Sequence, residues 1–214
     1  MKRRYCRLKG CLIALVLLLL VSGCGTGDDQ GIPFWDDFED SGSGWGTDQR
    51  EEFDRGYKDG EYFIELHEPN WFAWADPGVQ ADDVTVEVDA HLTFGSQASH
   101  FGVLCRYTDE DNFYYFAVSA DGYYAIFRRE NGRELEVMTG DGEGMIFSSA
   151  IRTGEQTNHI QAVCQGDELS LYVNGGLLET ITDATHSQGG VGLGVGSGLE
   201  GDARIQFDDF VAKP

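Results

Sequence analysis

Short segments in which apolar and polar residues alternate follow one another along most of the chain. The clearest covers residues 84–94, where Val84, Val86 and Val88 occupy every second position. A period of two residues predicts a half-buried β-strand. Aromatic residues are densest in residues 101–129, and polar turns divide this stretch. It therefore predicts three successive strands, at residues 101–107, 112–119 and 123–129.

The rest of the chain after residue 33 continues the same pattern. It predicts strands at residues 34–38, 61–67, 71–74, 133–138, 158–165, 168–173, 177–182, 189–197 and 203–211. Residues 140–153 are irregular, with one short helical turn expected, and alternate glycines in residues 189–197 indicate close packing or a bend. Many short strands without a long helix predict an all-β fold. Specifically, we expect a two-sheet antiparallel β-sandwich (jelly roll) over residues 34–214.

The net charge of the chain limits the classes of partner that it can bind. The formal net charge is -22, and five of the 15 basic residues lie within the first nine residues, which contain no acidic residue. The remaining 10 basic and 37 acidic residues give the rest of the chain a net charge of -27. Such a field disfavours DNA, RNA or an anionic membrane surface as partners, and we expect no nucleic acid to bind.

The first 23 residues predict a helical lipoprotein signal peptide. A basic start precedes the apolar run at residues 11–21, which is too short for a membrane-spanning helix. Val21-Ser22-Gly23-Cys24 then resembles a bacterial lipobox. The resemblance implies lipidation of Cys24, a flexible tether over residues 24–33 and a membrane-anchored protein outside the cytoplasm. An ordinary signal peptide or an uncleaved anchor is the alternative.

Two cysteines lie in the predicted sandwich. Cys105 and Cys164 each fall on the apolar face of a predicted strand, so both sulfurs are expected to point to the interior. In an exported chain such a pair predicts a disulfide, although two buried free thiols are the alternative.

Several short segments resemble the concanavalin A-like (laminin-G-like) jelly rolls, in the branch called 3-keto-disaccharide hydrolase-like. The resemblance covers residues 34–212 and rests on Asp36-Asp37-Phe38, Gly60-Glu61-Tyr62, Phe101-Gly102-Val103, Arg106-Tyr107, Asp109, Asn112-Phe113-Tyr114, Asp121-Gly122-Tyr123-Tyr124, Leu171-Tyr172-Val173-Asn174-Gly175, Gly190-Val191-Gly192-Leu193 and Phe207-Asp208-Asp209-Phe210. It implies two curved antiparallel sheets, with the first and last strands paired, and glycan contact as the commonest role.

One strand carries candidate catalytic residues. Glucanases of this fold use the pattern E-x-D-x-x-E, which places a nucleophile and an acid on one face. Glu87 and Asp89 match its first two carboxylates, but the third is missing, and only His91 shares their face. A solvated strand face is therefore the favoured interpretation, and these three residues are the hypothesis for a hydrolase.

Two further sites are predicted from residue types. Asp37 and Asp208 lie on the opening and closing strands, and if these strands pair, the carboxylates and their neighbours offer ligands to a structural Ca²⁺, although no cofactor is required. For a glycan, aromatic rings stack on sugar faces and polar side chains bind hydroxyls. The candidates are Trp71, Trp74, Arg106, Tyr114 and Tyr123, with Arg106 expected to point out from its sheet.

Together these features predict a lipid-anchored protein outside the cytoplasm that binds carbohydrate or a cell-surface partner. A glycan-active hydrolase and a purely structural envelope lipoprotein are the two alternatives.

Overall fold

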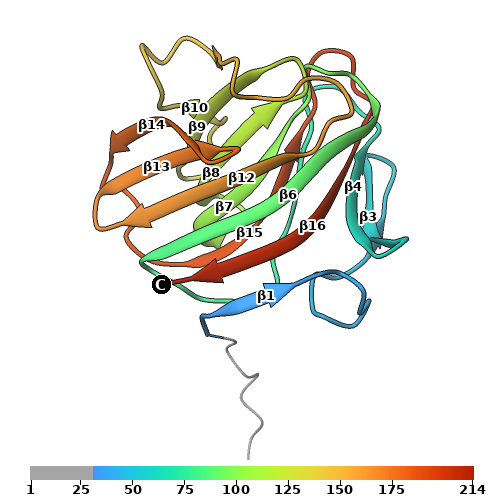
Figure 1. Cartoon of the computed structure of the whole chain (residues 1–214), viewed down its shortest axis with the longest axis horizontal. Helices are drawn as coiled ribbons and strands as arrows, with labels where there is room; N and C mark the ends of the chain where they lie inside the picture. The colour runs from blue at the N-terminus through green and yellow to red at the C-terminus, as the bar shows by residue number, and fades with distance from the viewer. Residues whose placement is uncertain (1–30) are drawn as a thin grey trace, which may run out of the picture.

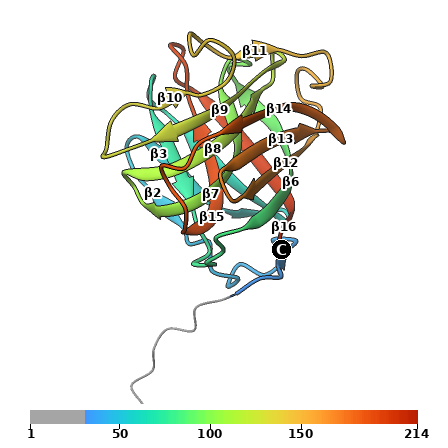
Figure 2. The same cartoon turned by 90° about the vertical axis from the view of Figure 1, so that its left-hand side faces the viewer.

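The computed structural model describes residues 31–214, so the predicted signal peptide, Cys24 and most of the tether lie outside the described residues. Within that range every regular element is a β-strand, and the strands form two antiparallel sheets that face each other (Figures 1 and 2). The predicted two-sheet β-sandwich is confirmed. Among residues 31–214 there is no helix with the length and hydropathy needed to cross a membrane.

The larger sheet has nine strands, and Figure 1 shows several of them in the front layer. Its spatial order is β14 (Gly176–Thr182), β13 (Glu168–Val173), β12 (Asn158–Gln165), β6 (Val84–Gly95), β16 (Ala203–Lys213), β4 (Glu61–Leu66), β3 (Phe53–Lys58) and β2 (Asp48–Gln49), with β1 (Phe34–Asp36) also paired to β16. Phe34 lies opposite Ala212 in this last pair. The pairing of the first and last strands, which the family resemblance implies, is thus confirmed.

The second sheet has seven strands and lies behind the first in Figure 1. Its spatial order is β10 (Glu136–Val137), β9 (Tyr123–Arg129), β8 (Asn112–Ser119), β7 (His100–Asp109), β15 (Gly190–Gly196) and β5 (Phe72–Ala75), with β11 (Ile146–Phe147) also paired to β9. The three aromatic strands predicted at the middle of the chain lie side by side as β7, β8 and β9.

A hydrophobic core fills the space between the two sheets. In β6, every second residue from Val84 to Leu92 is buried in it, as strand alternation requires. Cys105 on β7 and Cys164 on β12 belong to the same core and form the predicted disulfide, which joins one sheet to the other. The structure thus confirms both the predicted pairing and the inward orientation of these two residues.

The structure differs from the sequence prediction in three regions of the chain. Strands β2 and β3 were not predicted, because β3 contains Asp54, Arg55, Lys58 and a central Gly56, and lies beside the sheet edge where polar residues are tolerated. The strand expected at residues 133–138 is limited to β10. Residues 140–153 contain β11 in place of the expected helical turn.

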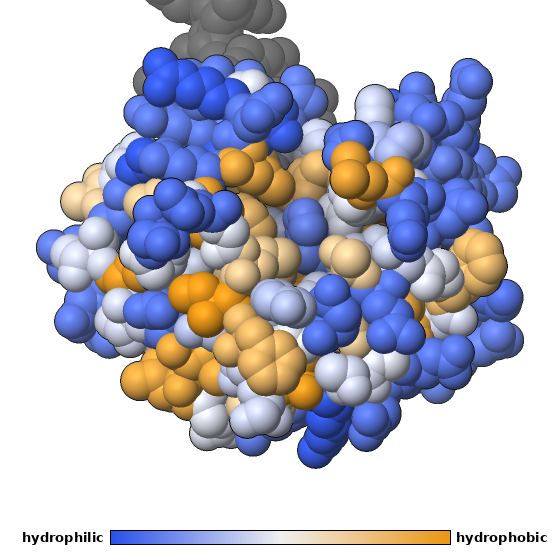
Figure 3. Space-filling model, turned by 90° about the horizontal axis from the view of Figure 1, so that it is seen from above, coloured by the Kyte–Doolittle hydropathy of each residue, from blue (hydrophilic) through white to orange (hydrophobic). Residues whose placement is uncertain are grey.

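The molecular surface is largely hydrophilic. Seen from above the view of Figure 1, hydrophobic side chains interrupt this surface in several patches (Figure 3). The large hydrophobic side chains that are exposed are Trp35, Trp71, Phe94, Tyr123, Phe147, Leu177 and Leu199. They come from different parts of the chain, and Trp71 among them lines a groove.

Candidate functional site

The face of the seven-stranded sheet that points away from the other sheet carries a second hydrophobic cluster, called here the outer cluster. Its buried members are Leu104, Phe113, Tyr115, Ala117, Ala125 and Phe127. On β8 the residues between them, including Tyr114 and Phe116, belong to the core between the sheets. An antiparallel sheet with one solvated face alternates apolar and polar residues. This sheet is apolar on both faces, so its outer face either packs against other parts of the chain or is available to a ligand.

Strand β5 adds two aromatic side chains, Phe72 and Trp74, to the edge of the outer cluster, and Trp71 directly precedes the strand. The rings of Phe72 and Trp74 are nearly parallel, with centroids 6.2 Å apart and planes at 18°. Phe72 is also nearly parallel to Phe113, at 5.7 Å and 16°. The indole N–H of Trp74 donates a hydrogen bond of 2.9 Å to the hydroxyl of Tyr107, which fixes its orientation. Trp71, at the start of this segment, is 38% exposed.

The glycines of β15 make room for these rings. A Cβ atom placed at Gly194 would lie 2.9 Å from Phe72 and 2.9 Å from Tyr115, and one at Gly196 would collide with the ring of His100. The close packing that the alternating glycines indicated is therefore confirmed. Aromatic side chains from β5, β7 and β8 lie directly over the β15 backbone because this strand presents no side chains there.

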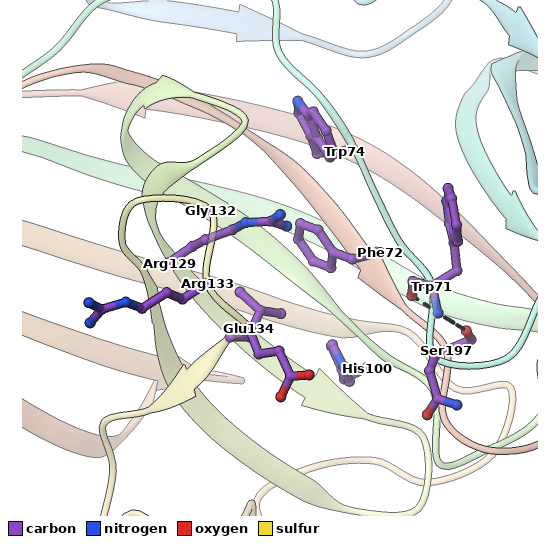
Figure 4. Close-up of a pocket in the computed structure, with 11 residues that line it drawn as sticks. Trp71, Phe72, Trp74, His100, Arg129, Gly132, Arg133, Glu134 and Ser197 are labelled. Atoms are coloured by element: carbon purple, nitrogen blue, oxygen red, sulfur yellow. Dashed lines mark hydrogen bonds between the residues drawn. The ribbon is translucent and has the colours of Figure 1, made fainter.

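A groove of about 780 Å³ lies against the outer cluster (Figure 4). It is lined by Asn70, Trp71, Phe72, Trp74, His100, Arg129, Gly132, Arg133, Glu134, Leu135 and Ser197. One wall is the aromatic segment of β5, and the other is formed by the end of β9 and the turn that follows it. The groove thus combines flat apolar surfaces on one side with charged groups on the other.

His100 contributes an imidazole of defined tautomer to the groove. The hydroxyl of Tyr115 donates to the carbonyl of Gly194 at 3.2 Å, and the same hydroxyl lies 3.2 Å from Nδ1 of His100. Because the Tyr115 proton is already used, Nδ1–H of His100 is the donor in the second bond, and Nε2 is left as an acceptor. Burial lowers the pKa of His100 to about 4, so the ring is neutral at physiological pH.

The predicted ligand-binding residues are divided among three places. Trp71 and Trp74 line the groove, whereas Tyr123 lies at the start of β9 and packs edge-to-face against Phe147 at 5.7 Å. Tyr114 is buried in the core between the sheets, where its hydroxyl donates to Asp183. Burial raises the pKa of Tyr114 to about 12, and the neighbouring Asp183 adds to this effect. The predicted set does not converge on one site.

The expectation that Arg106 points out from its sheet is wrong. Arg106 is 1% exposed, and its guanidinium donates to the carbonyls of Asp82, Gly166 and His186, the last at 2.8 Å. The register of β7 against β8 shifts between Cys105 and Asp109, and Arg106 has a φ of 52°. This β-bulge interrupts the alternation on which the expectation depended and turns the side chain inward.

The candidate catalytic carboxylates lie on the opposite side of the molecule, on the outward face of the nine-stranded sheet. Lys213 Nζ lies 2.8 Å from Glu87, and His159 Nδ1 lies 2.7 Å from Asp89. The partner histidine is therefore His159 on β12, not His91. The sequence offered no signal for His159, because the register that places it opposite Asp89 arises from strand pairing.

The predicted cation ligands are close enough to influence each other. Burial raises the pKa of Asp208 above its ordinary value, and the negative charges of Asp209, Asp89 and Asp37 raise it further. However, no three histidine, cysteine or acidic side chains among residues 31–214 are grouped so as to hold a metal ion. The Ca²⁺ site at Asp37 and Asp208 therefore stays a prediction.

Most of the groove residues were not predicted from sequence. Phe72 lies within the predicted aromatic segment and was open to prediction as a neighbour of Trp71 and Trp74. His100, Arg129 and Glu134 come from β7, β9 and the turn before β10, which are far apart in sequence. Only the sheet order β10-β9-β8-β7-β15-β5 brings them to one surface.

No protein-family model matches this chain, and no curated protein matches its sequence. Solved structures do match. A carbohydrate-binding module, CBM66, from Bacillus subtilis is 20% identical, with a TM-score of 0.56, and the match covers 86% of this chain and 99% of that one. A Bacillus subtilis protein of unknown function with a galectin-like fold has 8% identity, a TM-score of 0.62, and coverage of 84% and 94%.

A third match is the catalytic domain of an endo-1,3-beta-glucanase (laminarinase) from Thermotoga petrophila, at 11% identity and a TM-score of 0.55, covering 84% of this chain and 95% of that domain. At these identities the likeness shows the fold alone. The chain has a galectin-like, concanavalin A-like β-sandwich, in agreement with the coarse level of the family resemblance. Proteins with this fold include a carbohydrate-binding module and glycan-active enzymes.

Proposed function

We propose that this chain binds a saccharide in the groove against the outer cluster. The observation that carries the proposal is the aromatic wall formed by Trp71, Phe72 and Trp74, which faces polar and charged groups across the groove. Flat rings stack on the apolar faces of sugars, while neighbouring polar groups bind the hydroxyls and fix orientation. Nε2 of His100 is an acceptor suited to a sugar hydroxyl. The carbohydrate-binding module among the matched structures is consistent with this role.

Binding without hydrolysis is the better-supported form of this function. Glycoside hydrolysis generally requires two carboxyl groups on either side of the scissile bond. Among the described residues that line the groove, Glu134 is the single carboxylate. Glu87 and Asp89 lie on the other sheet and are engaged with Lys213 and His159. Membership of the 3-keto-disaccharide hydrolase-like branch, and any activity it implies, stays a prediction.

We also propose that the protein is anchored outside the cytoplasm through a lipid on Cys24 and that it contacts the membrane through that anchor alone. The signal-peptide pattern and the lipobox resemblance support this part of the proposal. Expression of Cys24→Ala in the native host tests it. The variant is expected to lose labelling by a fatty acid and to keep its signal peptide, and unchanged labelling with unchanged processing would contradict the anchor.

Glycan binding is tested by an array screen and titration of the purified full chain. Trp74→Ala removes one ring of the aromatic wall and is expected to weaken binding by up to about tenfold, since stacking of one ring contributes roughly 0.5–1.5 kcal/mol. Trp35→Ala is the matched control, because Trp35 is 70% exposed on β1 and does not line the groove. Equal affinity of the two variants would refute the proposed site.

A further inference from the structure

Arg129 lines the groove, and its side chain has no carboxylate partner among residues 31–214. Its Nε–H is buried and donates to no acceptor among residues 31–214, and its guanidinium forms no ion pair with any carboxylate of that range. On β9 it follows Phe127 on the outward side and lies opposite Phe113 on β8. Figure 4 shows its side chain extending across the groove towards Phe72.

Arg129 is one of three arginines in residues 31–214, with Arg133 and Arg152, that form no ion pair in that range. Arg128, the preceding residue, points to the other side of the strand and pairs with Glu136 and Asp183, each at 2.7 Å. Five of the eight arginines in residues 31–214 pair with a carboxylate: Arg50, Arg55, Arg106, Arg128 and Arg204. A half-buried arginine that contacts no acidic side chain between residues 31 and 214, in so acidic a chain, leaves its donors available to a ligand.

We propose that the groove is specific for an acidic saccharide, one that contains a uronic acid whose carboxylate is bound by Arg129. This inference rests on the proposed function and specifies its ligand. The planar guanidinium matches a carboxylate with two parallel hydrogen bonds, a geometry that an ammonium group lacks. The aromatic wall receives the sugar ring, and Arg129 lies across the groove from it.

The charge of the groove supports the same ligand. Arg129 and Arg133 line the groove together with one acid, Glu134, and His100 is neutral, so the lining carries one net positive charge. The chain as a whole has a formal net charge of -22. Its long-range field repels polyanions, but at physiological salt this repulsion is screened beyond about 8 Å. The electrostatic interaction of a carboxylate bound within the groove is then mainly with the nearby Arg129.

The test uses pairs of glycans that differ only in charge. Polygalacturonate, alginate, glucuronoxylan and hyaluronan are each compared with their carboxyl-reduced forms, in which every uronate becomes a neutral sugar with a CH₂OH group. Neutral glucans, xylans and fructans complete the panel. Binding of the purified full chain is titrated at 0.15 M salt, so that long-range repulsion contributes little.

At least one uronate glycan is expected to bind, and its carboxyl-reduced form is expected to bind about tenfold or more weakly, as for the loss of a charge-assisted hydrogen bond. Arg129→Gln is expected to reduce binding of the acidic form by a similar factor and to leave the reduced form unaffected. Arg152→Gln is the matched control, since Arg152 also lacks an ion pair among the described residues but does not line the groove.

The outcomes separate this inference from the proposed function. If neutral glycans bind as well as or better than every uronate, saccharide binding stands and the acidic specificity is refuted. If no glycan of either kind binds, the proposed function fails as well. The comparison of matched glycans uses the unmodified chain, so a misfolded variant does not affect it. Equal loss in Arg129→Gln and Arg152→Gln would also contradict the assignment.

Discussion

Gly194 on β15 has no side chain, which lets the aromatic rings beside the groove pack against the strand. Gly194→Ala is therefore expected to destabilise the protein. The new Cβ would lie 2.9 Å from Phe72 Cζ and 2.9 Å from Tyr115 Cε2, whereas ordinary van der Waals contact begins at 3.4 Å. Both rings must therefore shift by about 0.5 Å. These rings pack against Phe113, Phe127 and each other, so the movement disturbs the outer cluster.

Two opposing effects set the magnitude. Overpacking of a well-filled cluster costs about 1–3 kcal/mol. Replacing a glycine reduces the conformational entropy of the unfolded chain, which stabilises the protein by about 0.4–1 kcal/mol where the backbone is compatible. We therefore expect Gly194→Ala to lower the free energy of unfolding by about 1–2 kcal/mol. Gly198→Ala provides the control, because its Cβ would meet no atom within 4 Å. In that variant only the entropic gain remains, so stability is expected to stay unchanged or to rise by up to about 1 kcal/mol.

Urea unfolding of the two variants and the parent chain measures these differences directly. The two substitutions are predicted to act in opposite directions or, at least, to differ by more than about 1 kcal/mol. Equal stabilities, or a Gly194→Ala protein more stable than Gly198→Ala, would show that the rings over β15 are not tightly packed. The close approach of Phe72 and Tyr115 to the strand would then be incorrect.

Three further predictions concern stability. Replacing both Cys105 and Cys164 by alanine opens a loop of 59 residues and is expected to lower the free energy of unfolding by about 4 kcal/mol in the chain-entropy model, as measured by urea unfolding. Alkylation of both Cys105 and Cys164 in the unsubstituted chain without reductant would instead show that the bridge is absent. His100 has a pKa lowered from 6.5 to about 4, so below pH 6.5 the unfolded chain binds a proton that the folded ring excludes. Stability is therefore expected to fall as the pH drops from 6.5 to 4, by at most about 3 kcal/mol, and His100→Gln should lose this part of the slope; identical slopes would contradict the assignment. Arg106→Leu leaves three carbonyls without their donor and is expected to cost about 2–4 kcal/mol by thermal or urea unfolding, whereas a neutral effect would refute the inward orientation of Arg106.

The fold was largely predictable because alternation and turn residues act locally. The segment at residues 84–94 alternates throughout, and β8, β9, β12 and β13 begin and end where the sequence predicts. The inward phase of Cys105 and Cys164 followed from the same alternation. Strand β3 was missed because Asp54, Arg55 and Lys58 interrupt its apolar pattern, as a position next to the edge strand β2 permits.

The site was much less predictable, since it depends on sheet order and on one local irregularity. Trp71 and Trp74 were recognisable as an exposed aromatic segment. Arg129 was not recognisable, because nothing local distinguishes it from Arg128. It faces the groove because of the phase of β9 and because β5 lies three strands away from β8 in the sheet. Arg106 was misassigned because a bulge in β7 cannot be recognised from residue alternation.

The most direct test of the central claim is ¹⁹F NMR of the chain labelled with 5-fluorotryptophan, titrated with the glycan that binds best on the array. The chain contains four tryptophans, which give four signals assignable by substitution. Trp71 and Trp74 line the groove, Trp45 is buried in the core between the sheets, and Trp35 is exposed on β1. The account predicts that the signals of Trp71 and Trp74 shift with saturation while those of Trp35 and Trp45 do not. A shift confined to Trp35, or no shift at saturating glycan, would contradict it.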